Sequence, residues 1–175
     1  MNQTISENYL KLQKKLHKNP SYGVVSIKFA PNVKKIVEDA KLSSISDYGA
    51  GKKNLQKTLN KLGLNNFQYY PYDPAFPEYG PPKEADLVCC IDVLEHVEEI
   101  FLDNVLNDLK KITKKFGFFT IHSGPAVKVL EDGRNAHLIQ KPPSWWLPKM
   151  CDRFEIKHLQ EIPGGFVLVT KLKDA

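Results

Sequence analysis

The segment ADLVCCID, residues 85–92, restricts the fold more than any other part of this sequence. Its apolar run from Leu87 to Ile91 is unbroken instead of alternating with polar residues, which is typical of a strand buried on both faces of a parallel sheet. Parallel neighbours need crossover connections, and these are usually helices. The segment therefore predicts an α/β fold with a mostly parallel, Rossmann-like sheet and helices on both faces.

The rest of the chain supplies strand-like and helical segments in alternation. Strands are expected at 42–47, 67–73, 85–92 and 116–122, and helices at 5–18, 31–40, 53–63, 95–115 and from Trp145 onward. Pro31 is expected to begin the second helix and Gly117 to end the fourth. The segment 154–172 predicts two strands joined at Pro163-Gly164-Gly165 with no room for a crossover helix, so this C-terminal pair must be an antiparallel hairpin.

Length and composition limit the number of domains. The chain has 175 residues, of which 42% are hydrophobic, so it can bury one full core but is too short for two ordinary domains. We expect a single domain over residues 1–175. Residues 1–40 would supply N-terminal helices, and 122–150 would form an insertion near the binding site.

Charge and cysteine content indicate the surroundings. The three cysteines, Cys89, Cys90 and Cys151, follow neither a disulfide framework nor a metal-ligand spacing, which favours a reducing cytoplasm and no structural metal. No segment resembles a secretion signal or a membrane span, so we expect a soluble protein with no membrane partner. The net charge of +5 arises from scattered lysines, which favours a solvated surface over a nucleic-acid interface.

Polar residues stand where the expected parallel strands end, and ligands of open α/β sheets bind there. These residues are Asp47-Tyr48-Gly49-Ala50-Gly51, Asp73, Asp92-Val93-Leu94-Glu95-His96 and His122-Ser123-Gly124. Glycines let backbone approach a ligand closely, yet no phosphate-binding glycine pattern is present. The acid before the turn suits a ligand that carries an amine. The simpler alternatives are a tight strand-to-helix turn at the glycines and helix caps at Asp47 and Asp92.

Together, DYGAG (47–51), the acid Asp73, ADLVCCIDVLEHV (85–97) and the terminal hairpin resemble the class I S-adenosylmethionine-dependent methyltransferases. The resemblance covers about residues 20–172, and it implies S-adenosyl-L-methionine as cofactor and S-adenosyl-L-homocysteine as product. It also implies Asp47 near the cofactor ammonium and Asp73 on the ribose hydroxyls. The implied cofactor-binding residues are Asp47, Tyr48, Gly49, Gly51, Tyr72, Asp73, Asp92, Val93, Leu94 and His96.

The chain departs from this family in three places. The third strand of the family's sheet is missing or vestigial near residue 80. No clear acid precedes the 85–92 strand to hold the adenine amine, although Glu78 could serve. Lys52 and Lys53 directly follow the glycine turn, which could shift the outer edge of the cofactor.

The insertion 122–150 begins at a strand end where the methyl acceptor should lie, and we expect it to cover the site. His122, Arg134, Asn135 and His137 are the candidates for orienting the acceptor or removing its proton. The alternative is that Arg134 and Asn135 only stabilise a turn. Trp145 and Trp146 would then be core anchors of the last helix.

The resemblance predicts methyl transfer to the oxygen or nitrogen of a small molecule or a sugar. Residues 92–95 lack the Pro-Pro motif of DNA amine methyltransferases, and neither Cys89 nor Cys90 lies in a loop as base C5 methylation requires. A nucleic-acid acceptor is the first alternative. The second is a non-catalytic S-adenosylmethionine-binding subunit, which would expose Trp145, Trp146 and Leu147 for a partner. A nicotinamide-dependent oxidoreductase is the least favoured interpretation.

Overall fold

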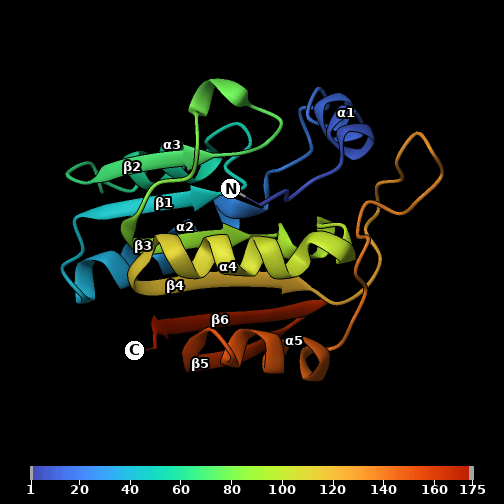
Figure 1. The fold of residues 1–175 in the computed structure, drawn as a ribbon. Helices are drawn as coiled ribbons and strands as arrows, with labels where there is room; N and C mark the ends of the chain where they lie inside the picture. Colours follow the sequence, from blue (N-terminus) through green and yellow to red (C-terminus); the bar gives the residue numbers. More distant parts are fainter. Residues whose placement is uncertain (1, 174–175) are drawn as a thin grey trace.

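Six strands form one sheet in the computed structural model, which describes residues 2–173 (Figure 1). Their order across the sheet is β2-β1-β3-β4-β6-β5. The strands are β1 (Ser44–Tyr48), β2 (Gln68–Tyr72), β3 (Ala85–Ile91), β4 (Thr113–His122), β5 (Phe154–Ile162) and β6 (Gly165–Leu172). The first four in this order pair in parallel, whereas β6 pairs antiparallel with β4 and with β5. The predicted Rossmann-like sheet and terminal hairpin are confirmed.

Helices cover both faces of the sheet (Figure 1). One face carries α2 (Val25–Asp39) and α3 (Asn54–Lys61), and the other carries α4 (Leu102–Ile112) and α5 (Pro143–Cys151). The side chains of β3 divide between the two cores, because Cys89 packs with α2 and α3 whereas Cys90 packs with α4 and α5. Both cysteines are completely buried, as expected for a strand covered on two faces. Within residues 2–173, no helix has the length and apolar character that a membrane crossing requires.

The second helix is longer than predicted. It begins at Val25, so Pro31 lies inside α2 instead of at its start. A proline inside a helix removes one backbone hydrogen bond, and this normally ends or kinks the helix. The part of α2 that precedes Pro31, residues 25–30, buries Phe29 and Ala30 against the sheet, and Pro31 itself faces solvent. Burial of these side chains offsets the lost hydrogen bond.

The predicted helix over 95–115 was wrong at both ends. Two short 3₁₀ turns, Leu94–His96 and Glu99–Phe101, precede α4, with extended backbone at Val97 and Glu98 between them. At the other end, Thr113 already belongs to β4, and its hydroxyl donates to the carbonyl of Leu109 at 2.7 Å. The apolar periodicity continues through all of these segments because they pack on the same core, so it does not reveal the breaks.

The segment between β2 and β3 forms a 3₁₀ turn, Pro77–Tyr79, instead of a strand. This agrees with the missing third strand expected near residue 80. Phe76 and Tyr79 stack with their rings nearly parallel, and the Tyr79 hydroxyl donates to the carbonyl of Gly51 at 2.9 Å. The turn is therefore anchored to the glycine turn after β1.

Helix α1 (Glu7–Leu16) lies beyond the carboxyl ends of the parallel strands, at the same end of the sheet as the segment 123–142 that links β4 to α5 (Figure 1). The two form a third hydrophobic cluster, in which Tyr9 packs with Leu130 and Ala136. Ser6 fixes the start of α1, since its backbone N–H and its hydroxyl both donate to Glu98 at 2.7 Å. Together α1 and the segment 123–142 form a cap over the strand ends.

Gly117 lies within β4 instead of ending a helix, and packing explains this glycine. A Cβ atom there would lie 2.4 Å from the ring of Phe119 and 2.6 Å from Oγ1 of Thr170, both completely buried. We therefore expect Gly117→Ala to lower the free energy of unfolding by about 2 kcal/mol, as overpacked core sites do. Urea denaturation measures this.

Gly124→Ala is the matched control for Gly117→Ala. Its Cβ would meet the ring of His122 at 3.6 Å, which is an ordinary contact, so stability should change by less than about 0.5 kcal/mol. Equal effects of the two substitutions would contradict this account of Gly117.

Candidate functional site

A cleft opens at the carboxyl ends of β1, β2 and β3, beneath α1. Its empty space, which includes open solvent at its mouth, is about 970 Å³. Polar residues at its wall include Gln13, His17, Tyr22, Asp47, Asp73, Asp92 and His96. Of the cofactor residues expected from the sequence, Asp47, Tyr48, Gly49, Gly51, Asp73, Asp92, Val93 and His96 line the cleft. Leu94 is completely buried in the core, and Tyr72 packs beside Tyr48.

The glycine turn after β1 is pinned to the end of β2. The backbone N–H groups of Gly49 and Ala50 both donate to the carbonyl of Tyr72, at 2.7 and 2.9 Å. Gly49 and Gly51 have φ angles of +84° and +47°, which favour glycine. A Cβ atom on Gly49 would lie 2.3 Å from Cγ2 of Val93, so this glycine also admits the turn that follows β3. The turn therefore joins three strand ends into one rigid floor.

Asp73 lies at the floor of the cleft, where it follows β2. Its carboxylate accepts from the N–H of Gly51 at 2.9 Å and from that of Ala75 at 2.8 Å. Burial raises the pKa of Asp73, and the nearby His17 and these two N–H donors oppose that shift. Each carboxylate oxygen retains a lone pair for a further donor. The residue is thus suited to accept hydrogen bonds from hydroxyl groups of a ligand.

Helix α1 contributes residues that the sequence reasoning missed. Tyr9 and Gln13 lie four residues apart and His17 four further on, so all three lie on the same side of the helix. The Tyr9 hydroxyl donates to the carbonyl of His96 and accepts from Gln13 Nε2, both at 2.6 Å, and Gln13 Oε1 accepts from Tyr22. The regular spacing of polar side chains in an otherwise amphipathic helix was the signal available in the sequence.

His17 faces Asp73 across the cleft. Its Nε2 lies 3.9 Å from Oδ2 of Asp73, and a Cβ atom on Gly51 would meet the His17 ring at 3.2 Å. Burial lowers the pKa of His17, against the attraction of Asp73. The other ring nitrogen, Nδ1, is buried and has no hydrogen-bond partner among the described residues. This nitrogen is therefore an unsatisfied polar atom of a residue that lines the cleft.

Asp47, at the end of β1, is buried beside the cleft. The hydroxyl of Tyr69 donates to its carboxylate. Burial raises the pKa of Asp47 to about 7, and the charge of Asp73 acts in the same direction. Ionisation of Asp47 therefore depends on what enters the cleft, since a cation beside it would favour the carboxylate form.

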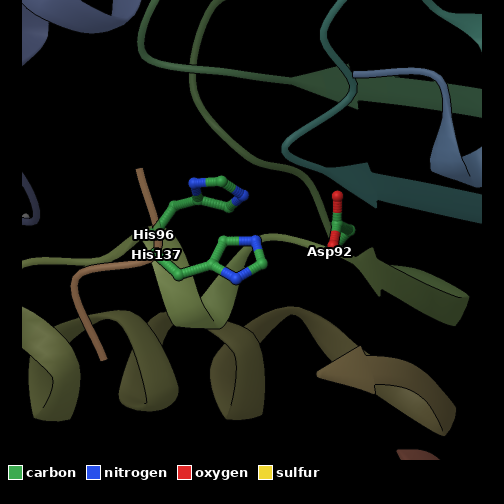
Figure 2. Close-up of side chains that lie close together, drawn as sticks. All are labelled: Asp92, His96 and His137. Carbon is green, nitrogen blue, oxygen red and sulfur yellow. The ribbon is translucent and has the colours of Figure 1, made fainter. Parts of the chain in front are cut away.

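Asp92, His96 and His137 form a cluster where the segment 123–142 of the cap meets the cleft (Figure 2). The His96 and His137 rings meet edge to face with centroids 4.7 Å apart. Burial lowers the pKa of His96 to about 4, and burial also lowers the pKa of His137. Both imidazoles are therefore neutral at pH 7. Among the four catalytic candidates from the sequence, His137 is the one that joins cleft-lining residues.

The other three candidates do not line the cleft, although the ring of His122 lies 4.9 Å from that of His137. The His122 ring covers Gly164 of the β5–β6 hairpin, since a Cβ there would lie 2.5 Å from its Nε2. Arg134 is exposed and pairs with Asp132 at 2.7 Å. Asn135 is bonded within the segment 123–142, accepting from the N–H groups of Ala126 and His137 and donating to the carbonyl of Ala126.

Two other expectations concern groups outside the cleft. Glu78 is exposed in its 3₁₀ turn and does not line the cleft. Trp146 is completely buried, whereas Trp145 and Leu147 are half-buried and pack against the same core. A free docking surface made of these three side chains, as the partner-subunit interpretation requires, is therefore not what the structure contains.

The sequence matches no family model and no curated protein. The fold is similar to the complex of DhpI with SAH, at a TM-score of 0.58 and 11% identity over 95% of this chain and 98% of that one. It is also similar to Burkholderia thailandensis 1,6-didemethyltoxoflavin-N1-methyltransferase with bound 1,6-didemethyltoxoflavin and S-adenosylhomocysteine. The TM-score is 0.63, and the identity is 12% over 99% of this chain and 94% of that one.

Magnesium protoporphyrin IX methyltransferase from Synechocystis PCC 6803 with bound SAH gives a TM-score of 0.56 and 11% identity over 99% of this chain and 90% of that one. At these identities the likeness shows the fold alone. The chain therefore has the Rossmann-like methyltransferase fold, and its chemistry has to be argued from its own residues.

The raised pKa of Asp47 predicts a pH dependence of stability. The carboxyl titrates near 3.8 in the unfolded chain and near 7 in the folded protein, so between these values the folded state binds the additional proton. Its contribution to stability is therefore present at low pH and is lost as the pH rises through 7. From pH 7.5 to pH 5, wild-type stability should gain about 2 kcal/mol relative to Asp47→Asn.

Urea denaturation of both proteins at the two pH values measures this difference. Histidines that titrate in the same interval are present in both proteins, so the comparison removes their effect. Asp152→Asn, at an exposed site, should behave like the wild type. A constant difference between wild type and Asp47→Asn would show that Asp47 is ionised throughout.

Proposed function

We propose that the protein is an S-adenosylmethionine-dependent methyltransferase that acts on a small-molecule or sugar acceptor. The observation that carries the proposal is the cleft in which the glycine turn, Asp47 and Asp73 converge. The methyltransferase fold supports it, and so do two neighbours named as methyltransferases of small molecules, 1,6-didemethyltoxoflavin and magnesium protoporphyrin IX.

The polar groups of the cleft fit this cofactor. Asp73 has lone pairs available for the two hydroxyls of a ribose, and the unpaired Nδ1 of His17 lies in the adjacent wall. Asp47 suits the ammonium of the amino-acid part, whose charge would favour its carboxylate form. Bound S-adenosylmethionine would supply an electrophilic methyl group. The absence of a phosphate-binding glycine pattern agrees with a cofactor that carries no phosphate.

The residues of the chain would act mainly by positioning. Methyl transfer from a sulfonium requires the acceptor atom, the methyl carbon and the sulfur in line, and alignment supplies much of the rate enhancement. The rigid floor made by the glycine turn and Val93 would fix the cofactor, and the cap would exclude water. The cluster of Asp92, His96 and His137 would face the acceptor.

Calorimetric titration with S-adenosylhomocysteine tests the cofactor. Wild type should bind with micromolar affinity and should not bind NAD or ATP. Asp73→Asn should weaken binding by about tenfold or more, because a carboxylate that accepts hydrogen bonds contributes more than a neutral amide.

Asp86→Asn is the matched control, since Asp86 is also a buried acid but lies at the opposite end of β3, where it accepts from the N–H and hydroxyl of Ser43. It should lower stability while leaving affinity unchanged. If the folded wild type binds neither S-adenosylmethionine nor S-adenosylhomocysteine, the proposal is refuted.

A further inference from the structure

The cluster of Asp92, His96 and His137 has the composition of a metal site. One ligand atom from each residue lies within 4.8 Å of the other two. We propose that these three side chains bind a divalent first-row transition-metal ion, such as Zn²⁺, at the capped end of the cleft. The inference stands on the geometry of the cluster and does not depend on the proposed methyl transfer.

Hydrogen bonds fix both histidines in the form that a metal requires. Nδ1 of His96 lies 2.7 Å from the carbonyl oxygen of Ala136, and Nδ1 of His137 lies 2.8 Å from that of Gly124. A carbonyl oxygen only accepts, so each Nδ1 carries the hydrogen and each Nε2 presents its lone pair. Metal-binding histidines almost always donate their second N–H to a carbonyl or carboxylate in this way.

The free nitrogens point toward the carboxylate. Figure 2 shows that the Nε2 edges of His96 and His137 both lie on the side of Asp92. Ligands at about 2.0 Å from a tetrahedral ion are roughly 3.3 Å apart, so metal binding would draw the three ligand atoms together from their present separations of up to 4.8 Å. Two imidazoles and one carboxylate are a donor set that Zn²⁺ and other first-row ions accept.

Three protein ligands leave a coordination position open, which distinguishes catalytic from structural metal sites. Asp92 and His96 line the cleft, so the open position would be reached from the cleft. A small molecule with an oxygen donor could occupy it. The spacing of the three cysteines argues against a structural metal site built from cysteines. The proposed site contains no cysteine, so that argument does not apply to it.

Binding at this site would also tie the cap to the sheet. Asp92 follows β3, His96 belongs to the next 3₁₀ turn, and His137 comes from the segment 123–142. If His137 is a ligand, its Nε2 cannot also remove a proton from an acceptor. The proposed role of His137 is therefore metal binding instead of the base catalysis considered from the sequence.

Titration with Co²⁺ alone tests the proposal, because its visible absorption reports coordination geometry without any enzymatic assay. The full-length protein, freed of metal with a chelator, should bind one equivalent with micromolar affinity and show bands of low-coordinate Co²⁺. Zn²⁺ should displace it and raise the melting temperature. Absence of saturable binding to the folded wild type would overturn the proposal.

Two variants identify the ligands. Asp92 has φ +59°, a conformation that asparagine tolerates, so Asp92→Asn should retain the fold. Asp92→Asn and His137→Gln each remove a proposed metal ligand. Loss of a residue that only hydrogen-bonds to a ligand weakens metal binding by roughly 10- to 100-fold, so each of these variants should weaken Co²⁺ binding by more than that. His158→Gln, at an exposed site on β5, should bind as wild type does.

Unchanged affinity in the folded Asp92→Asn variant, or equal losses in His158→Gln, would refute the assignment. Circular dichroism of each variant identifies any that has failed to fold. S-adenosylhomocysteine titration of the same samples separates the two proposals, since the proposed metal site does not require bound cofactor.

Discussion

The parallel register of β2, β1 and β3 determines which residues meet at the cleft. Asp47 of β1 lies opposite Pro71 of β2 on one side and Cys89 of β3 on the other, so these strands end at nearly the same level. The acids Asp73 and Asp92 that follow β2 and β3 are thereby brought to the same edge as Asp47. Three carboxyl groups from distant parts of the sequence thus converge through backbone pairing alone, and the cleft favours ligands that carry hydroxyls or positive charge.

One side chain of the cap, Tyr9, belongs to two environments. The ring of Tyr9 packs with Leu130 and Ala136, whereas its hydroxyl donates to the carbonyl of His96. Lys52 adds a second connection, because its ammonium donates to the carbonyls of Asn19 and Tyr22 at 2.6 and 2.9 Å. The N-terminal segment therefore contacts both the glycine turn and the segment 123–142.

Local patterns in the sequence were sufficient to predict the sheet but not to predict how the cap packs on it. Continuous apolar runs such as 87–91 and the polar residues that follow them predicted the strands and the edge where ligands bind. The helix breaks at Val97 and Thr113 were not predictable, because the apolar periodicity there reflects a shared core. Pro31 was misread as a helix start, since burial of Phe29 overrides its local preference. His17 was missed because its role depends on the docking of α1, a tertiary contact.

Among the residues of the cluster, Asp92 is the one with a left-handed backbone conformation. A non-glycine residue with φ +59° adopts the left-handed conformation at a cost of about 1 kcal/mol. Asp92 is held there because its N–H lies 3.1 Å from the carbonyl and 3.0 Å from the hydroxyl of Thr120 on the neighbouring strand. Glycine would relieve the strain but would remove the carboxylate. Lys41 and Lys53 have similar positive φ angles and lie outside the cluster. The proposed metal site therefore rests on the position of the Asp92 carboxylate beside two histidines with free Nε2 lone pairs, and not on the backbone of the turn.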